Sequence, residues 1–184
     1  ELVDVRDMAA SFDDSSTQRV LQLKVLNPVS HQQGAWVAVP PPDGDWDLGN
    51  VQNVEATVKN SGEESVNTLL WVVGSNGWAA VGSETNLGAG QTAKLSCNLR
   101  KTYRDGTPRI DPGQIKHIRI MTQRATTASL EVTTMVASGK VGNWVRPEGH
   151  LDLPAMVEGV PASGKRVRSP LAADPYTDIN RARS

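Results

Sequence analysis

The chain has 184 residues, of which 38% are hydrophobic, and a formal net charge of −1 from 19 Lys and Arg against 20 Asp and Glu. It is long enough for one domain, has no apolar run of the roughly 18 residues that a membrane span needs, and has no basic excess to neutralise phosphates. A transmembrane segment is therefore excluded, and nothing indicates nucleic-acid binding. The single cysteine, Cys97, excludes an intramolecular disulfide and a paired-cysteine metal site.

Residues 1–139 alternate between apolar and polar side chains, which is typical of strands with one buried face. The segments that show this alternation are 21–25, 54–58, 92–99, 117–120 and 129–136. In the third segment Cys97 falls on the apolar side, so we expect it in the core. In the last segment, the positions expected to face inward are Leu130, Val132 and Val136. Turn signals separate the segments, and no stretch shows a sustained helical period.

These patterns predict an all-β fold of seven to nine short strands, arranged as an antiparallel two-sheet sandwich. A jelly roll is favoured over an immunoglobulin-like domain, because the paired cysteines and their tryptophan are missing. Residues 140–184 differ from the rest: they carry five of the eleven prolines and more basic than acidic side chains. We expect a domain at 1–139 and a Pro-rich extended tail or linker at 140–184. The start at Glu1, with no initiator Met or signal peptide, predicts a piece of a longer, processed protein.

One segment, residues 68–73, is apolar on both sides of the expected strand. If Leu70 and Val72 point into the core, then Leu69, Trp71 and Val73 form an apolar strip on the opposite face of the sheet. An exposed strip of this kind indicates a contact surface. The alternative is that the strip is covered, either by the tail folding back or by burial of both faces.

Three tryptophans are candidates for stacking on sugar rings. Trp71 and Trp78 are the main ones, and Trp36 is predicted on the non-core side of its strand. An indole offers a flat apolar plate with one N–H group, which suits the C–H face of a pyranose.

On the strand around Ile118 and Ile120, the outward row contains polar groups able to hydrogen-bond with sugar hydroxyls. These are His117, Arg119 and Gln123. The alternative for that row is a solvated strand face. Trp46 and Trp144 are expected to be structural, closing the Asp-rich loop and anchoring the start of the tail.

Several short motifs, in order, give residues 12–139 a resemblance to a known family. They are Phe12-Asp13-Asp14, Trp36-Val37-Ala38-Val39, Asp45-Trp46-Asp47-Leu48-Gly49, Val54-Glu55-Ala56-Thr57-Val58-Lys59-Asn60, Leu87-Gly88-Ala89-Gly90, Ile110-Asp111-Pro112, Ile115-Lys116-His117-Ile118 and Leu130-Glu131-Val132-Thr133-Thr134-Met135-Val136-Ala137-Ser138-Gly139. Together they resemble the galactose-binding-like jelly-roll modules of polysaccharide-degrading enzymes, and are similar in layout to the N-terminal accessory domain of some β-agarases.

The resemblance implies a noncatalytic carbohydrate-binding module that targets a parent glycoside hydrolase to a polysaccharide such as an algal galactan. It also implies a secreted bacterial protein, extracellular or periplasmic, and a structural calcium. Asp13 and Asp14 are the candidate ligands. Such modules often close with an Asp-Asn pair, and Thr133-Thr134 in its place removes an anionic calcium ligand. The triplet Asp43-x-Asp45-x-Asp47 lacks the glycine and glutamate of an EF-hand.

No pattern for catalysis is present. There is no Gly-x-Ser-x-Gly elbow, no Walker loop and no zinc-binding histidine pair, so no catalytic residue is assigned. Carboxylates that could pair for glycoside hydrolysis are Asp105, Asp111, Glu84 and Glu131. The competing hypothesis to sugar binding is a structural accessory domain that packs through its apolar strip on the catalytic domain of the same chain.

Overall fold

The computed structural model describes residues 4–13, 19–27, 34–74, 79–123 and 127–145. None of these residues is helical, and they form ten strands. The strands are β1 (Asp4–Arg6), β2 (Met8–Asp13), β3 (Val20–Val25), β4 (Ala35–Val39), β5 (Val51–Asn60), β6 (Val66–Gly74), β7 (Ala80–Leu87), β8 (Thr92–Asn98), β9 (Ile115–Gln123) and β10 (Ser129–Lys140).

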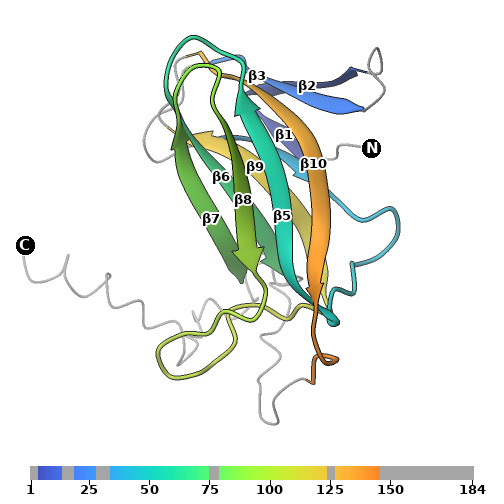
Figure 1. The fold of residues 1–184 in the computed structure, drawn as a ribbon. Coiled ribbons are helices and arrows are strands. Elements are labelled where there is room, and N and C mark those ends of the chain that lie inside the picture. Colours follow the sequence, from blue (N-terminus) through green and yellow to red (C-terminus); the bar gives the residue numbers. More distant parts are fainter. Residues whose placement is uncertain (1–3, 14–18, 28–33, 75–78, 124–126, 146–184) are drawn as a thin grey trace, which may run out of the picture. The chain divides into compact units, whose positions relative to one another are not determined.

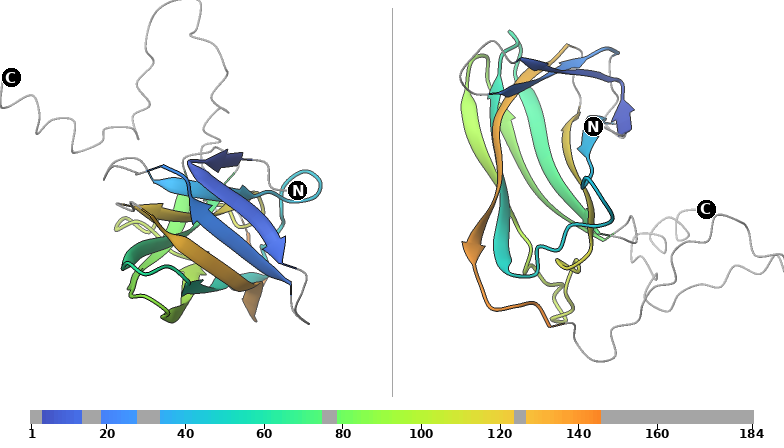
Figure 2. Two further views of the ribbon diagram at one scale, coloured as in Figure 1. Left: turned by 90° about the horizontal axis from the view of Figure 1, so that it is seen from above. Right: turned by 90° about the vertical axis from the view of Figure 1, so that its right-hand side faces the viewer.

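The strands make two five-stranded antiparallel sheets, which lie face to face as two layers (Figures 1 and 2). Sheet 1 has the order β1-β4-β9-β6-β7, and sheet 2 has the order β2-β3-β10-β5-β8. The chain passes from sheet 1 to sheet 2 at Asp7, whose backbone has a φ of 53° between β1 and β2. The predicted all-β jelly-roll β-sandwich is confirmed. The expected extension at 140–184 lies almost wholly outside the described residues.

The core fills the space between the sheets and is built by the predicted alternation. In β5, Val54, Ala56 and Val58 are at most 1% exposed, while their neighbours along the strand are only partly buried. In β8, Cys97 is fully buried as expected, and its thiol donates to the Leu70 carbonyl at 3.2 Å. The inward side chains of both sheets therefore form one apolar layer.

The prediction for Val136 is wrong. Val136 is 49% exposed, and Met135 packs against the core instead. The cause is an irregularity in the pairing of β10 with β5: Val132 pairs with Val58, but Thr134 pairs with Thr57. One extra residue in β10 therefore reverses which positions face inward from that point on.

At one end of the sandwich, Asn60 ties β5 to its neighbours. It is fully buried, and its Nδ2 donates to the carbonyls of Glu64 at 2.7 Å and Leu87 at 3.0 Å. Its Oδ1 accepts from the Gly62 amide at 3.0 Å. At the other end, Trp46 exchanges backbone hydrogen bonds with Ile115 and packs against the core. The structural role expected for Trp46 is confirmed.

Candidate functional site

The outer face of sheet 1 gathers most of the side chains expected to bind sugar. Register places Trp36 opposite Met121, Trp71 opposite Arg119, Val73 opposite His117 and Asn67 opposite Gln123. The tryptophans and the polar row of β9 therefore share one face, across β4, β9 and β6. All ten described strands belong to the two sheets, so none of them forms a third layer on this face. Trp78 lies outside the described residues.

The predicted apolar strip is present but buried. Leu69 is 3% exposed and Val73 is 1% exposed, so the expectation of a surface strip is wrong. Register explains part of this: Leu69 lies between Met121 on β9 and Glu84 on β7, and Val73 lies beside His117. Longer side chains on adjacent strands are close enough to cover shorter ones. The alternative in which both faces are buried is the correct one for Leu69 and Val73.

Trp71 is only partly buried, and its indole lies across Gly82 of the edge strand β7. A Cβ built on Gly82 would sit 2.6 Å from the Trp71 Cδ1 and 2.7 Å from its Nε1. The ring therefore occupies the space that a side chain at position 82 would take. This contact lays the indole over the neighbouring strand instead of letting it stand upright.

Trp36 has a different environment. The guanidinium carbon of Arg6, from β1, lies 4.9 Å from the centre of the Trp36 ring, and that of Arg119, from β9, lies 5.0 Å away. Arg6 is paired in register with Trp36, which places both on this face. Arg119, predicted as a polar group for sugar hydroxyls, is one of these two arginines. Arg6 was missed, because β1 is three residues long and shows no alternation to recognise.

The part of the face on β6 and β7, away from Trp36, carries amide and carboxylate groups. The Asn67 Nδ2 donates to the Asn86 Oδ1 at 3.1 Å and to the Glu84 Oε1 at 3.4 Å. Gln123 lies beside Asn67 in register and is partly buried. The face thus combines planar apolar rings with planar donors and acceptors, a combination suited to binding sugars.

The carboxylates considered for glycoside hydrolysis are dispersed over the fold. Glu84 lies on the outer face of sheet 1, whereas Glu131 in sheet 2 pairs with Lys59 at 3.0 Å. Asp105 and Asp111 lie between β8 and β9. The amide of Thr107 donates to Asp105 at 2.9 Å and lowers the pKa of that carboxyl. Asp105 therefore stays ionised and is a poor general acid.

Cys97 is an equally poor nucleophile. Burial raises the pKa of its thiol to about 12, so the reactive thiolate is scarce near neutral pH. Glu55, whose pKa is lowered by the hydrogen bond from Lys94, is likewise held in its charged form. None of these shifts brings the pKa of a group toward pH 7, where acid–base catalysis works best.

The described residues give little support to the calcium site that the resemblance implies. Asp13 accepts a hydrogen bond from the Gln22 Nε2 at 3.3 Å, and Asp14 lies outside the described residues. In the described part of the chain, no three residues among His, Cys, Asp and Glu are grouped to hold a metal ion. A calcium site at Asp13 and Asp14 therefore stays a prediction from the sequence.

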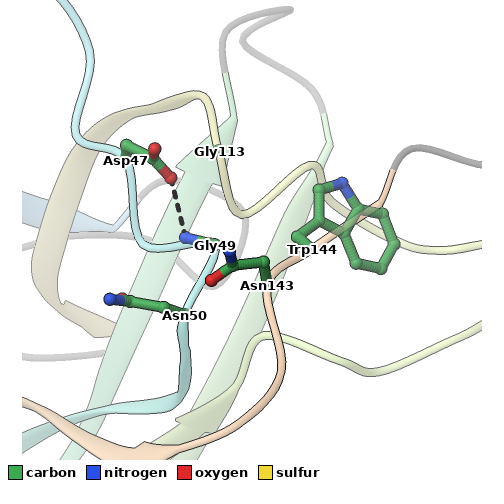
Figure 3. A pocket seen from close by; sticks show the side chains of 6 residues that line it. All are labelled: Asp47, Gly49, Asn50, Gly113, Asn143 and Trp144. Atoms are coloured by element: carbon green, nitrogen blue, oxygen red, sulfur yellow. Dashed lines mark hydrogen bonds between the residues drawn. The ribbon is translucent and has the colours of Figure 1, made fainter.

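A polar pocket of about 370 Å³ lies at the end of the sandwich where β10 finishes. It is lined by Asp47, Gly49, Asn50, Gly113, Asn143 and Trp144 (Figure 3). The Asp47 carboxylate accepts from the Gly49 amide at 2.9 Å, and the Trp144 indole points away from Asp47. The Trp144 amide donates to the Gly49 carbonyl at 2.8 Å, so Trp144 anchors the segment after β10 as expected.

Comparison with known proteins finds similarity in structure but not in sequence. No protein-family model matches the chain, and no curated protein matches it. Among solved structures, an exo-β-agarase aligns with a TM-score of 0.58 and 13% identity, over 76% of this chain and 23% of the agarase. A second agarase aligns with a TM-score of 0.53 and 13% identity, over 74% of this chain and 24% of that one.

A family 11 carbohydrate-binding module from Clostridium thermocellum also aligns, in a structure with a β-1,3-1,4-mixed-linked tetrasaccharide. Its TM-score is 0.51 at 13% identity, over 73% of this chain and 84% of the module. This chain thus spans about a quarter of the agarases but most of the module. At these identities the likeness establishes the fold.

The described residues include no helix that is both long and apolar enough to cross a membrane.

Proposed function

We propose that the chain is a noncatalytic carbohydrate-binding module whose ligand lies on the outer face of sheet 1. The observation that carries this proposal is the gathering of Trp71, Trp36 and the polar row of β9 on one face that no other described strand covers. The fold shared with a carbohydrate-binding module solved with a tetrasaccharide supports it.

Each group on the face has a distinct role in this proposal. The Trp71 indole, held over Gly82, stacks on the C–H face of a pyranose ring. His117, Arg119 and Gln123 on β9 hydrogen-bond with the hydroxyl groups of neighbouring sugar units. Trp78, just before β7, is a further stacking candidate from the sequence. No step of this function breaks a covalent bond, which fits the absence of an activated acid or nucleophile among the described residues with shifted pKa values.

The agarase likeness supports a proposal for the biological setting. Because the chain aligns with about a quarter of each agarase, it has the size of one domain of such an enzyme. We infer that it holds a secreted bacterial glycoside hydrolase, extracellular or periplasmic, against a polysaccharide such as an algal galactan. The alternative of a sugar-free structural domain is less favoured, because its proposed contact strip is buried at Leu69 and Val73.

Affinity gel electrophoresis of the chain with Trp71→Ala tests the proposal. The gels contain soluble plant and algal polysaccharides, agarose among them, and are run with and without chelator. One polysaccharide should retard the wild type, and Trp71→Ala should migrate as it does in a gel without glycan. Tyr103→Ala is the matched control, since Tyr103 is a 50% exposed aromatic residue in the segment between β8 and β9 and belongs to neither sheet.

Two results would contradict the proposal. The first is a wild-type chain that no glycan retards, which removes the binding function. The second is a Trp71→Ala chain that is retarded as strongly as the wild type, which moves the ligand away from this face. A thermal unfolding curve accompanies each variant, because lost binding counts only if the variant is folded.

A further inference from the structure

The edge strand of sheet 1, β7, presents its outer row of side chains to solvent (Figure 1). On this strand the outward residues Gly82, Glu84 and Asn86 are exposed, while Val81 between them and the start of the strand lies in the core. On the neighbouring strands β6 and β9, the outward side chains of the same face are partly or fully buried. The row on β7 is therefore the part of this face that is most accessible to a ligand.

The stacking group of the proposed site lies on this same row. The Trp71 indole covers Gly82, because its Cδ1 and Nε1 lie 2.6 and 2.7 Å from the place of a Cβ there. Glu84 follows two residues along β7, about 7 Å further on, since a strand rises by about 3.4 Å per residue. That step is comparable to the length of one sugar unit. When a glycan runs along β7 with one unit on Trp71, the next unit therefore lies beside Glu84.

The protein holds one oxygen of the Glu84 carboxylate in place. The Asn67 Nδ2, on β6, donates to the Glu84 Oε1 at 3.4 Å and to the Asn86 Oδ1 at 3.1 Å. Asn67 therefore positions both side chains of the row. Among the residues that the structure describes, no further hydrogen bond and no ion pair engages Glu84. Its Oε2 is thus able to accept from a ligand, because an ionised carboxylate has about four acceptor sites.

The row is also fixed from the inner side of β7. The Ser96 amide, on the edge strand β8 of sheet 2, donates to the Ser83 Oγ at 3.3 Å. The edge strand β7 is therefore tied both to β6 and to the other sheet. Groups that are held in place before binding lose less conformational freedom when the ligand arrives, which favours affinity.

We propose that Glu84 is a specificity-determining residue of the sugar site, whose carboxylate accepts hydrogen bonds from adjacent hydroxyl groups of the unit next to the one on Trp71. This inference rests on the proposed sugar-binding function, and adds the direction of the glycan, along β7, and the class of unit beside Glu84. Because an ionised carboxylate accepts hydrogen bonds but donates none, that unit carries free hydroxyl groups. A sulfate ester or a uronate in its place is repelled by like charge.

Isothermal titration calorimetry with two sets of oligosaccharides tests this inference. The neutral set contains agaro-oligosaccharides and β-1,3-1,4-mixed-linked gluco-oligosaccharides, and the anionic set contains sulfated carrageenan oligosaccharides and oligogalacturonates. We expect the wild type to bind at least one neutral sugar more tightly than every anionic one. Glu84→Gln should weaken that binding about tenfold, because a hydrogen bond to a charged acceptor contributes more than a hydrogen bond to a neutral one.

Glu131→Gln is the matched control. It makes the same substitution on β10 of sheet 2, where Glu131 pairs with Lys59, and it should bind like the wild type.

Glu84→Asp separates sugar binding from a second role of the charge. An exposed charge on an edge strand also prevents pairing with a second chain, so Glu84→Gln could self-associate for that reason alone. Glu84→Asp keeps the charge but draws the carboxylate back by one methylene group, away from the hydroxyl groups. It should stay monomeric by size-exclusion chromatography, melt like the wild type and still bind the neutral sugar about tenfold more weakly.

The outcomes separate this inference from the proposed function. If the wild type binds a sugar and Trp71→Ala does not, but both Glu84 variants bind like the wild type, this inference is wrong and the sugar-binding function stands. The inference is also wrong if an anionic sugar binds more tightly than every neutral one. If no oligosaccharide binds the wild type, both proposals are wrong. A loss of binding in Glu131→Gln as large as that in Glu84→Gln would reflect the net charge of the protein, and would overturn the inference.

Discussion

Gly82→Ala removes nothing from the candidate site and adds one methyl group beneath Trp71. The new Cβ would lie 2.6 Å from the Trp71 Cδ1, whereas ordinary contacts begin at 3.4 Å, so the indole must move by about 0.8 Å or more. Gly82 is exposed on an edge strand, and its φ is not positive, so alanine fits the backbone. The substitution therefore changes the orientation of the ring and little else.

The expected loss of binding follows from the area of one indole face. That face is roughly a third of the 150–250 Å² that an aromatic side chain buries, about 60 Å². At ~25 cal/mol per Å², losing this contact costs ~1.5 kcal/mol, or about tenfold in Kd. Folding stability should change by less than ~1 kcal/mol, since alanine lowers the entropy of the unfolded chain while the displaced ring opposes the gain.

Calorimetric titration with the glycan found by gel retardation measures the Kd, and thermal unfolding measures stability. Gly142→Ala is the control, because a Cβ at Gly142 meets nothing within 4 Å. We expect Gly82→Ala to bind about tenfold more weakly with a melting temperature that changes by less than about 5 °C, and Gly142→Ala to bind like the wild type. An unchanged Kd for Gly82→Ala would refute the argument that the position of Trp71 over β7 serves binding.

Four further predictions concern three residues of the core. The Thr122 hydroxyl is buried with no hydrogen-bond partner among the described residues, so Thr122→Val should raise the melting temperature by about 3 °C; a lower value would show that the hydroxyl is satisfied. Asn60→Ala removes three hydrogen bonds and should cost about 3 kcal/mol in denaturant unfolding, and a cost below about 1 kcal/mol would contradict its role as a tie. Cys97 should not react with a thiol reagent at pH 8 in the folded protein, and rapid stoichiometric labelling would be contrary to its burial. Because folding raises the pKa of the Cys97 thiol from 9.0 to about 12, the contribution of this thiol to stability is complete below pH 9.0 and declines as the pH rises toward about 12. Cys97→Ala should reduce this decline.

The sandwich could be predicted because alternation reports directly on which residues face the core. Val54, Ala56 and Val58 occupy successive inward positions of β5, and the same rule places Leu95 and Cys97 in β8. The rule fails at Val136, because a single extra residue in β10 reverses the alternation and leaves no signal in the hydrophobic pattern.

The candidate face could be predicted only in part. Parity placed Trp36, Trp71 and Arg119 on the non-core side of their own strands, but it gave no information on which strands lie beside them. The burial of Leu69 depends on its neighbours on β7 and β9, and the position of the Trp71 ring depends on a glycine eleven residues later. Arg6 joins the site only through the pairing of β1 with β4. Contacts between strands distant in sequence require the register, which one sequence does not reveal.

The central claim is that the outer face of sheet 1 binds a polysaccharide through Trp71. Its most direct test is retardation of the wild type and of Trp71→Ala in gels containing a single soluble glycan, with both proteins shown to be folded. The account predicts a retarded wild type and a freely migrating variant. Equal retardation of the two proteins, or free migration of the wild type through every glycan, would contradict it.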